Sequence, residues 1–225
     1  MQRYTLNGQQ ESKTQEMEYS SHKPELIIIA GPNGSGKTTV TNQFLQHEWS
    51  KDTVYINPDN VAQSLFGDWN SMDAVLKAAN YCRSWREECL KKRLSMVFET
   101  VLSAQDKIDF ILKAKEAGYF IRIFFVGTAN PKINASRIAQ RVMEGGHDVP
   151  ITKIISRYSK SMLNCRIIAP LVDRLYVYDN SVDDENAKIQ YRLTEGKIAK
   201  QYVQNIMPWA KVILENGLSD EELSK

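Results

Sequence analysis

The sequence predicts an α/β fold of three layers, in which a mostly parallel central sheet lies between helices. Short apolar runs alternate with longer helical patterns from Pro24 onward, and this alternation is typical of repeated βαβ units. The runs are rich in Ile, Val, Phe and Tyr, as expected of strands buried on both faces. Strands are expected at 25–30, 53–57, 95–99, 119–127 and 174–178, and helices at 37–48, 71–92, 104–117, 132–144 and 151–168.

The length and the two ends of the chain define the expected domain. A chain of 225 residues can bury one sizeable core. Residues 1–23 are polar, rich in Gln, Glu and Ser and without periodicity, so we expect a flexible arm there. A single domain is expected at 24–216, followed by a frayed tail at 217–225.

The last part of that domain has a different pattern. Segments 188–193 and 197–202 flank Thr-Glu-Gly and predict a β-hairpin with Gly196 in the turn. A final helix is expected at 208–215. The predicted domain therefore ends in a C-terminal hairpin plus helix.

Composition and charge exclude several classes of protein. Lys and Arg number 29 against 27 Asp and Glu, and this near balance disfavours a general polyanion binder. The longest aliphatic run, residues 26–30, is too short to cross a bilayer, and the first residues lack the apolar core of a secretory signal. Cys82, Cys89 and Cys165 have no metal-ligand spacing, so buried, reduced thiols in a cytoplasmic protein are expected.

The most informative stretch is a glycine-rich loop between an aliphatic strand and a helix. Residues 31–38 fit G-x-x-x-x-G-K-[ST], the P-loop motif, and predict a P-loop NTPase-type fold. Glycines let successive backbone N–H groups turn toward phosphate oxygens, and the helix N-terminus favours the same anion. Lys37 would contact the β- and γ-phosphates, and the Thr38 hydroxyl suits Mg²⁺. The residues expected to bind the nucleotide are Gly31, Pro32, Asn33, Gly34, Ser35, Gly36, Lys37, Thr38 and Thr39.

Two carboxylates follow the next two predicted strands, at the edge where ligands bind in open α/β sheets. Asp59 can deprotonate an acceptor hydroxyl or help to hold magnesium, and the alternative is a helix cap. Glu99, followed by Thr100, can bind substrate hydroxyls or orient magnesium-bound water, and the alternative is a cap or a solvated turn. Neither a standard Walker B run nor the guanine-reading Asn-Lys-x-Asp is visible, which disfavours a GTPase.

A basic segment at 132–160 predicts a lid. It holds six Lys and Arg residues against two acidic ones, in a chain whose net charge is only +2. Arg137 and Arg141 are four residues apart and share a helix face, while Arg157 lies on the next helix. Inward arginines on a helix–loop–helix can stabilise a transferring phosphate, whereas the alternative is a solvated basic face. His147, in the loop, is expected to contact substrate because no second metal ligand is near.

Together these segments resemble the zeta-toxin family of P-loop kinases, in its shorter bacterial form. The resemblance implies a kinase that uses ATP or GTP with Mg²⁺ and phosphorylates a sugar hydroxyl of UDP-N-acetylglucosamine. It also implies a partner, a small helical antitoxin that blocks the nucleotide site. The segments that carry it are 31–38, 57–59, 98–103, 115–119, 141–150 with its Gly-Gly-His-Asp-Val-Pro loop, 157–158 and 175–181.

The same resemblance implies roles for individual residues. Lys37 and Thr38 would hold phosphates and magnesium, and Asp59 would be the general base. Arg141 and Arg157 would clamp the γ-phosphate. Substrate contacts are expected from Glu99, Thr100, Arg137 and His147.

Two alternatives remain open at this point. The first is a kinase for another acceptor, such as a nucleotide, a cofactor hydroxyl or a nucleic-acid end. A polynucleotide is disfavoured because Tyr158 is the only aromatic residue in 132–160. The second is a regulatory ATPase that uses the nucleotide as a switch and needs neither Asp59 nor the lid arginines.

Overall fold

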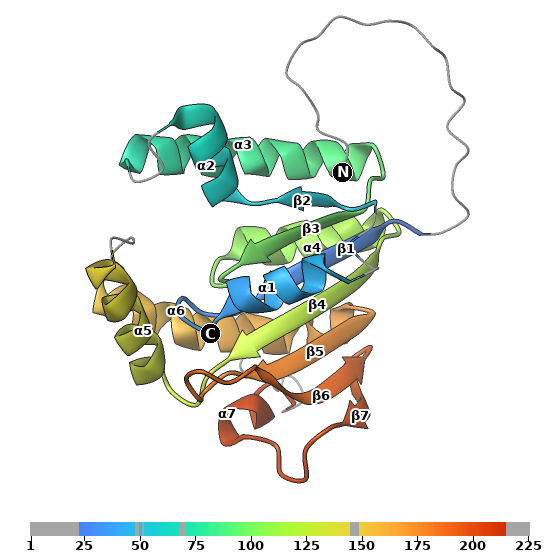
Figure 1. Ribbon diagram of the computed structural model, residues 1–225. Helices are drawn as coiled ribbons and strands as arrows, with labels where there is room; N and C mark the ends of the chain where they lie inside the picture. Colours follow the sequence, from blue (N-terminus) through green and yellow to red (C-terminus); the bar gives the residue numbers. More distant parts are fainter. Residues whose placement is uncertain (1–22, 48–49, 51, 68–70, 145–148, 215–225) are drawn as a thin grey trace, which may run out of the picture.

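The fold is an α/β sandwich built on one mostly parallel sheet (Figure 1). The structure, a computed structural model, describes residues 23–47, 50, 52–67, 71–144 and 149–214. Over these residues the sheet has seven strands in the order β2-β3-β1-β4-β5-β6-β7. The first five in this order are parallel, and β6 and β7 are antiparallel. The predicted three-layer architecture is therefore confirmed.

Strands and helices alternate along the chain, as the sequence predicted. The strands are β1 (Glu25–Ala30), β2 (Val54–Ile56), β3 (Met96–Thr100), β4 (Phe120–Gly127), β5 (Arg174–Asp179), β6 (Lys188–Thr194) and β7 (Lys197–Gln201). The helices are α1 (Lys37–Leu45), α2 (Pro58–Phe66), α3 (Met72–Lys91), α4 (Gln105–Glu116), α5 (Pro131–Met143), α6 (Ile151–Ile168) and α7 (Pro208–Lys211), with a 3₁₀ turn, η2 (Ala169–Leu171).

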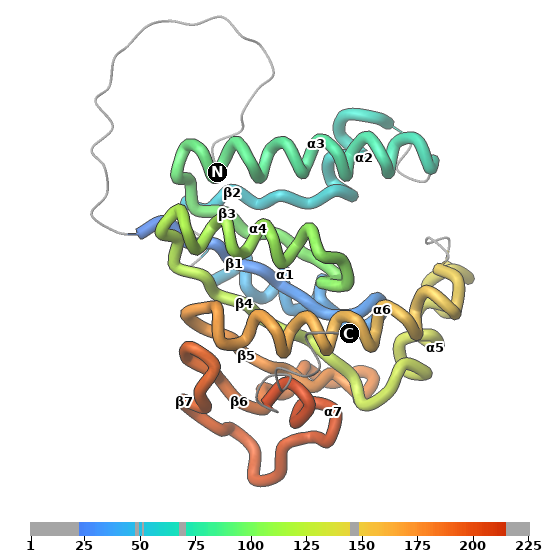
Figure 2. Tube along the Cα trace, turned by 180° about the vertical axis from the view of Figure 1, so that it is seen from behind, coloured from blue at the N-terminus to red at the C-terminus, as the bar shows by residue number. Residues whose placement is uncertain are grey.

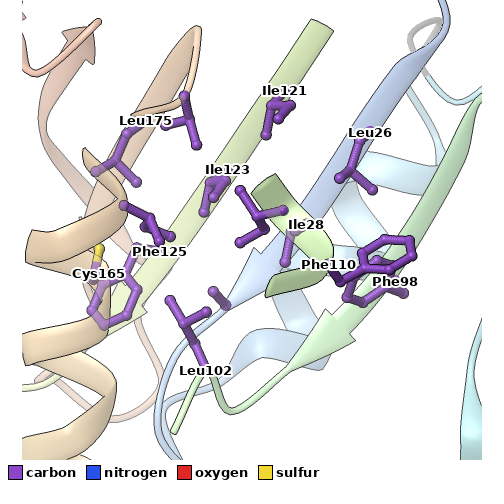
Figure 3. Packing of buried hydrophobic residues seen from close by; sticks show 14 of the residues in the cluster. Leu26, Ile28, Phe98, Leu102, Phe110, Ile121, Ile123, Phe125, Cys165 and Leu175 are labelled. Carbon is purple, nitrogen blue, oxygen red and sulfur yellow. The ribbon is translucent and has the colours of Figure 1, made fainter. Parts of the chain in front are cut away.

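The main core lies on the face of the sheet that α4 and α6 cover (Figure 2). Alternate residues of β1 point to opposite faces, so Ile28 joins this core while Ile29 joins a smaller one under α1. Phe110 of α4 and Cys165 of α6 pack against the strands here (Figure 3). Because both faces of β1 are covered, the strand is a continuous apolar run with no polar alternation.

The strand order creates the crevice in which a site is expected. β1 lies between β3 and β4, so the chain leaves β1 toward one edge and later returns on its other side. Ligands bind at such a switch point, beyond the carboxyl ends of the strands. The P-loop, between β1 and α1, lies at this edge, as do the segments that follow β2, β3 and β5.

Helix α6 serves two regions at once. Its second half is core, since Cys165 and Ile168 are fully buried, whereas its first half projects past the strand ends beside α5. We call α5 and the first half of α6 the lid. The lid is tied to the sheet where it leaves the core, because Ser161 Oγ donates to Val101 O at 2.7 Å and Tyr158 Oη donates to Thr128 O at 2.7 Å.

Two predictions about helices were wrong. The segment Pro58–Phe66 was not predicted as a helix, yet it forms α2, with Asn57 as N-cap, proline at the first position and Gly67 after the last. The final helix, expected at 208–215, ends at Lys211. After it, i→i+3 bonds from the N–H groups of Ile213 and Leu214 form tighter turns.

The predicted hairpin and the predicted state of the cysteines were confirmed. The hairpin joins β6 and β7 through Glu195 and Gly196, which both have positive φ, as a two-residue turn requires. The three cysteines are free and buried. Within the described ranges no helix combines the length and the apolarity needed to cross a membrane. The predicted arm at 1–23 and the frayed tail lie almost entirely outside the described residues, which begin at Lys23 and end at Leu214.

Candidate active site

The P-loop has the backbone that its glycines predicted. Gly34 and Gly36 have φ values of +75° and +89°, which side chains rarely adopt. Gly31 N donates to Thr100 O at 3.2 Å, so the start of the loop is fastened to the end of β3. Gly36 is followed at once by α1, whose first N–H groups have no side-chain cap. The loop and the helix N-terminus thus form one surface of N–H donors for an anion.

Ser35 gives an independent sign that an anion fits this loop. The side chain is fully buried, and its Oγ has no hydrogen-bond partner within the described part of the chain. Leaving a buried hydroxyl without a hydrogen-bond partner costs folding free energy, whereas a phosphate oxygen in the loop would accept a hydrogen bond from it. The residues present therefore fit the phosphates of a nucleotide.

Lys37 is the centre of the positive charge in the site. Its Nζ donates to Pro32 O at 3.0 Å, within the loop. The pKa of Lys37 is lowered to about 8, mainly by burial; the charge of Glu99 opposes this shift, and the charges of Arg141 and Arg157 add to it. Glu99 Oε2 accepts from the Thr38 hydroxyl at 3.3 Å and Arg157 Nη1 donates to Asn33 Oδ1 at 3.3 Å, so a carboxylate and a lid arginine both contact the loop that carries this lysine. An anion bound there would favour the charged form of the lysine.

A chain of hydrogen bonds connects the P-loop to the end of β2. The Thr38 hydroxyl donates to Glu99 Oε2 at 3.3 Å, and Tyr55 Oη donates to Glu99 Oε1 at 3.3 Å. Asn57 Nδ2 in turn donates to Tyr55 Oη at 2.7 Å. Both oxygens of Glu99 are therefore oriented by donors from different elements.

Thr38 and Glu99 also supply the oxygen donors that Mg²⁺ prefers. A hydroxyl and a carboxylate side by side at the P-loop suit a cation that completes its octahedron with phosphate oxygens and water. Among the described residues no cluster of three His, Cys, Asp or Glu could hold a metal by itself. The site is thus suited to a magnesium ion that arrives with a nucleotide.

Asp59 lies in the first turn of α2, and its side chain is exposed at the crevice edge. The helix cap is Asn57, whose Oδ1 accepts from Asp59 N at 2.8 Å, so the alternative in which Asp59 itself caps the helix is wrong. The pKa of Tyr55 is raised to about 12, mainly by burial; the hydrogen bond from Asn57 opposes the rise, and the charges of Glu99 and Asp59 add to it. Glu99 contacts this phenol directly, and the charge of Asp59 acts on the same group.

The lid packs directly on the P-loop. Asn134 Nδ2 of α5 donates to Asn33 O at 2.6 Å, and Arg157 Nη1 of α6 donates to Asn33 Oδ1 at 3.3 Å. A Cβ at Gly34 would lie 2.6 Å from Asn134 O, so only glycine permits this contact. Both lid helices thus meet the loop at one residue, Asn33.

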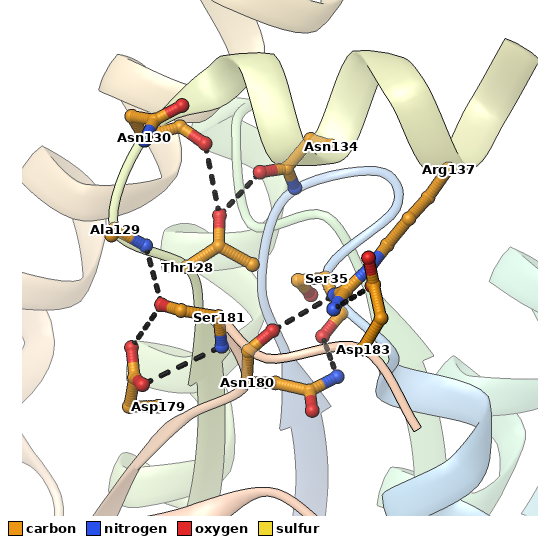
Figure 4. A network of polar contacts seen from close by, with 10 residues as sticks. All are labelled: Ser35, Thr128, Ala129, Asn130, Asn134, Arg137, Asp179, Asn180, Ser181 and Asp183. Carbon is orange, nitrogen blue, oxygen red and sulfur yellow. Dashed lines mark hydrogen bonds and ion pairs between the residues drawn. The ribbon is translucent and has the colours of Figure 1, made fainter. Parts of the chain in front are cut away.

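Arg137 takes a place that the sequence did not predict. Its guanidinium bonds Asp183 Oδ1 at 2.7 Å through Nε and Asn180 O at 2.8 Å through Nη1 (Figure 4). It lines a pocket of about 620 Å³ beside Gly36, which neither Asp59 nor Glu99 lines. Its substrate contact stays a prediction, and in the structure its guanidinium is bonded to Asp183 and to the Asn180 carbonyl.

Comparison with known proteins identifies the family. The zeta toxin profile matches residues 9–189, about four fifths of the chain. The chain belongs to the zeta toxin family. An uncharacterized protein of Haemophilus influenzae is 28% identical over 136 residues, which are 60% of this chain and 92% of that protein.

Solved structures share the zeta toxin fold of this chain. One comes from the PezAT chromosomal toxin–antitoxin system of Streptococcus pneumoniae, with 17% identity, a TM-score of 0.58, and 93% of this chain and 85% of the other covered. Another is the AvrRxo1-ORF1:-ORF2 complex with ATP, with 18% identity, a TM-score of 0.61, and 88% and 66% covered. At these identities the likeness shows the fold, that of a P-loop kinase.

Two other residues were predicted to contact substrate in this zeta toxin family member, Thr100 and His147. Thr100 is buried, and its Oγ1 accepts from Leu102 N at 3.2 Å, so its hydroxyl holds the turn after β3. His147 lies outside the described residues. Tyr55, Asn57 and Asn180 were missed as site residues, although Asn57 and Asn180 stand immediately after strands, where a polar side chain is a signal.

Tyr55→Phe tests the hydrogen bonds around Glu99. We expect binding of a fluorescent ATP analogue to require more Mg²⁺, because Glu99 loses one of its two donors and is no longer held beside Thr38. The free energy of unfolding should fall by about 1 kcal/mol, the worth of a hydrogen bond. Magnesium titrations and urea unfolding measure both effects, with Tyr81→Phe, an exposed tyrosine of α3, as the control. An unchanged magnesium requirement would contradict this role.

Proposed function

We propose that this protein is an ATP- and Mg²⁺-dependent kinase that phosphorylates a hydroxyl group of a small molecule. The observation that carries the proposal is that the lid arginine Arg157 contacts the P-loop at Asn33, close enough to Lys37 for its charge and that of Arg141 to act on the lysine. Cations gathered in this way serve to stabilise charge on a phosphoryl group during transfer. A nucleotide-binding module without transfer would not require arginines from a separate lid.

The nucleotide would lie along the P-loop with its phosphates under the lid. The nucleoside end would occupy the pocket of about 620 Å³ beside Gly36, between α1, α5 and the segment after β5. Amide side chains of Gln43 and Gln140 line this pocket and offer both donors and acceptors to a base. The γ-phosphate would then lie toward Lys37 and Arg141.

The acceptor would approach from the side of α2. The Asp59 carboxylate would accept the proton of the acceptor hydroxyl while the hydroxyl oxygen bonds to the γ-phosphorus and the bond to ADP breaks. Lys37 and the two lid arginines would stabilise the charge on the equatorial oxygens. Thr38 and Glu99 would hold Mg²⁺, which would offset part of the negative charge of the phosphates.

For the acceptor we propose a sugar hydroxyl of a UDP-activated amino sugar, such as UDP-N-acetylglucosamine. Membership of the zeta toxin family supports this choice. We propose a cytoplasmic location as well, because ATP and UDP-activated sugars are cytoplasmic metabolites. We also propose a small helical antitoxin as partner, since one similar structure comes from a toxin–antitoxin system. Co-expression with an adjacent small reading frame should then yield a complex that no longer binds ATP.

Labelled ATP and a panel of UDP-sugars, nucleosides and cofactor alcohols test the function. We expect label to appear on a UDP-amino sugar, with a mass increase of one phosphate and one ADP released per product. If the label appeared on another compound of the panel, the proposed kinase activity would stand and that compound would replace the UDP-amino sugar as the proposed acceptor. ATP hydrolysis that no acceptor stimulates would contradict the proposal and favour a nucleotide switch.

A further inference from the structure

We propose that Asn180 is a positioning residue for phosphoryl transfer, which holds the P-loop and the lid helix α5 in a fixed relation. This inference rests on the proposed function, because the effects of Asn180 on turnover and on nucleotide binding both require that the P-loop binds ATP. Asn180 follows β5 directly, and its backbone N–H donates to Gly127 O at 2.8 Å at the end of β4. The residue is thus anchored to the sheet before it makes its other contacts.

The side chain of Asn180 supports the P-loop from outside. Its Nδ2 donates to Ser35 O at 2.9 Å, which keeps this carbonyl directed away from the anion surface. The same Nδ2 would lie 2.2 Å from a Cβ at Gly36, so the amide fills the space that any other residue there would need. The peptide at the start of α1 is therefore held by Asn180 on one side and faces the anion surface of the P-loop on the other.

The backbone of Asn180 contacts the lid. Asn180 O accepts from Arg137 Nη1 at 2.8 Å, and Asp183 binds the other side of the same guanidinium (Figure 4). Arg137 and Arg141 share a face of α5, so fixing the first also sets the direction of the second. Arg141 is one of the two arginines whose charge acts on Lys37.

Two ties are needed to fix the direction of α5. Asn134 binds the P-loop at Asn33 near the start of the helix, and a single tie would leave the helix free to swing about that point. Arg137, almost one turn later, supplies the second tie through Asn180. The pair of contacts determines whether Arg141 faces the γ-phosphate.

The turn that carries Asn180 is itself held by further hydrogen bonds, one of which is buried. Asp179 Oδ1 accepts from Trp209 Nε1 of α7 at 2.7 Å and from Ser181 Oγ at 2.6 Å. Ser181 Oγ in turn accepts from Ala129 N at 2.8 Å, just before α5. Four segments of the chain thus meet at residues 179–181, and this rigid support lets one amide position the P-loop.

The test compares how tightly the purified protein binds AMP-PNP and ADP, each with Mg²⁺, by calorimetry. If Asn180 sets the P-loop and lid around the γ-phosphate, wild type should favour AMP-PNP over ADP by more than about tenfold. Asn180→Ala should reduce that preference to below threefold, because ADP lacks the group on which the lid acts. Gln201→Ala, which removes an exposed amide that also donates to a backbone carbonyl at 2.8 Å, is the matched control and should keep the preference.

Arg137→Ala provides a second variant, which removes the bond from the lid to the Asn180 carbonyl, whereas Asn180→Ala removes the bond from the Asn180 amide to Ser35. We expect it to lose the preference as well, and it decides the matter should Asn180→Ala fail to fold. With an acceptor identified, kcat of both variants should fall at least tenfold at saturating ATP, whereas the urea midpoint of Asn180→Ala should match that of Gln201→Ala. A retained preference for AMP-PNP in the folded variants would overturn the role of Asn180. Absence of ATP binding by wild type would instead refute the proposed function.

Discussion

Asp59→Asn is expected to lower kcat by about 10²–10⁴-fold, the usual contribution of a positioned general base. Asparagine keeps the size of the side chain and its place in the first turn of α2, but it cannot take the proton of the acceptor hydroxyl. Binding of ATP should change little, because the P-loop and the lid arginines hold the phosphates. Steady-state kinetics with the acceptor, together with calorimetry for ATP, measure the two quantities separately.

Asp73→Asn is the matched control for this variant. Asp73 is also an exposed aspartate in the first turn of a helix, α3, so both changes remove a similar favourable interaction with a helix N-terminus. The two variants should therefore have nearly equal unfolding free energies, and only Asp59→Asn should lose activity. If Asp59→Asn turned over like the control, proton removal would have to be assigned to another group.

Lys37→Ala is expected to lower kcat by about 10²–10³-fold, the cost of losing one preorganised electrostatic contact to the transferring group. It should also weaken ATP binding, since the phosphates would keep Arg141 and Arg157 but lose the cation inside the loop. Stability should not suffer, because burial already disfavours the charged form of Lys37 in the free protein. Calorimetry, kinetics and urea unfolding measure the three effects.

Two further lysine variants make this experiment decisive. Lys107→Ala removes a partly buried lysine that is paired with Asp106 and distant in sequence from the P-loop, and it should bind ATP normally. Lys37→Arg keeps the charge on a larger, planar group that cannot occupy the same space, so it should rescue little of the activity. Wild-type affinity for ATP in Lys37→Ala would show that the phosphates bind elsewhere.

The sequence was sufficient to predict the parts of the fold that local patterns determine. The aliphatic run of β1, the glycines of the P-loop and the Thr-Glu-Gly turn each carry their own physical reason, and the structure has each where it was expected. Helix α2 was not predicted although Asn57, Pro58 and Gly67 are ordinary start and stop signals, because only Val61 and Ala62 of its nine residues are buried and its apolar pattern is short. Helix α7 ended early, since its length depends on how Trp209 packs rather than on sequence period.

The candidate site was harder to predict because its contacts join residues far apart in the chain. Tyr55 meets Glu99 across 44 residues, and Asn180 meets Ser35 across 145, so no spacing in the sequence can reveal either pair. Arg137 and Arg141 were correctly placed on one helix, yet Asp183, which binds the Arg137 guanidinium, lies in a separate loop 46 residues later. Long-range pairing, not residue type, decided these roles.

Because α6 is one continuous helix, it connects the core to the P-loop. Arg157 stands on the same rigid rod as Cys165 and Ile168, and Ser161 and Tyr158 brace that rod where it emerges. The half of α6 that carries Arg157 cannot turn away from the sheet without disturbing the interior. A change in the packing around Cys165 or Ile168 would therefore also move Arg157, whose Nη1 donates to Asn33 Oδ1 of the P-loop at 3.3 Å.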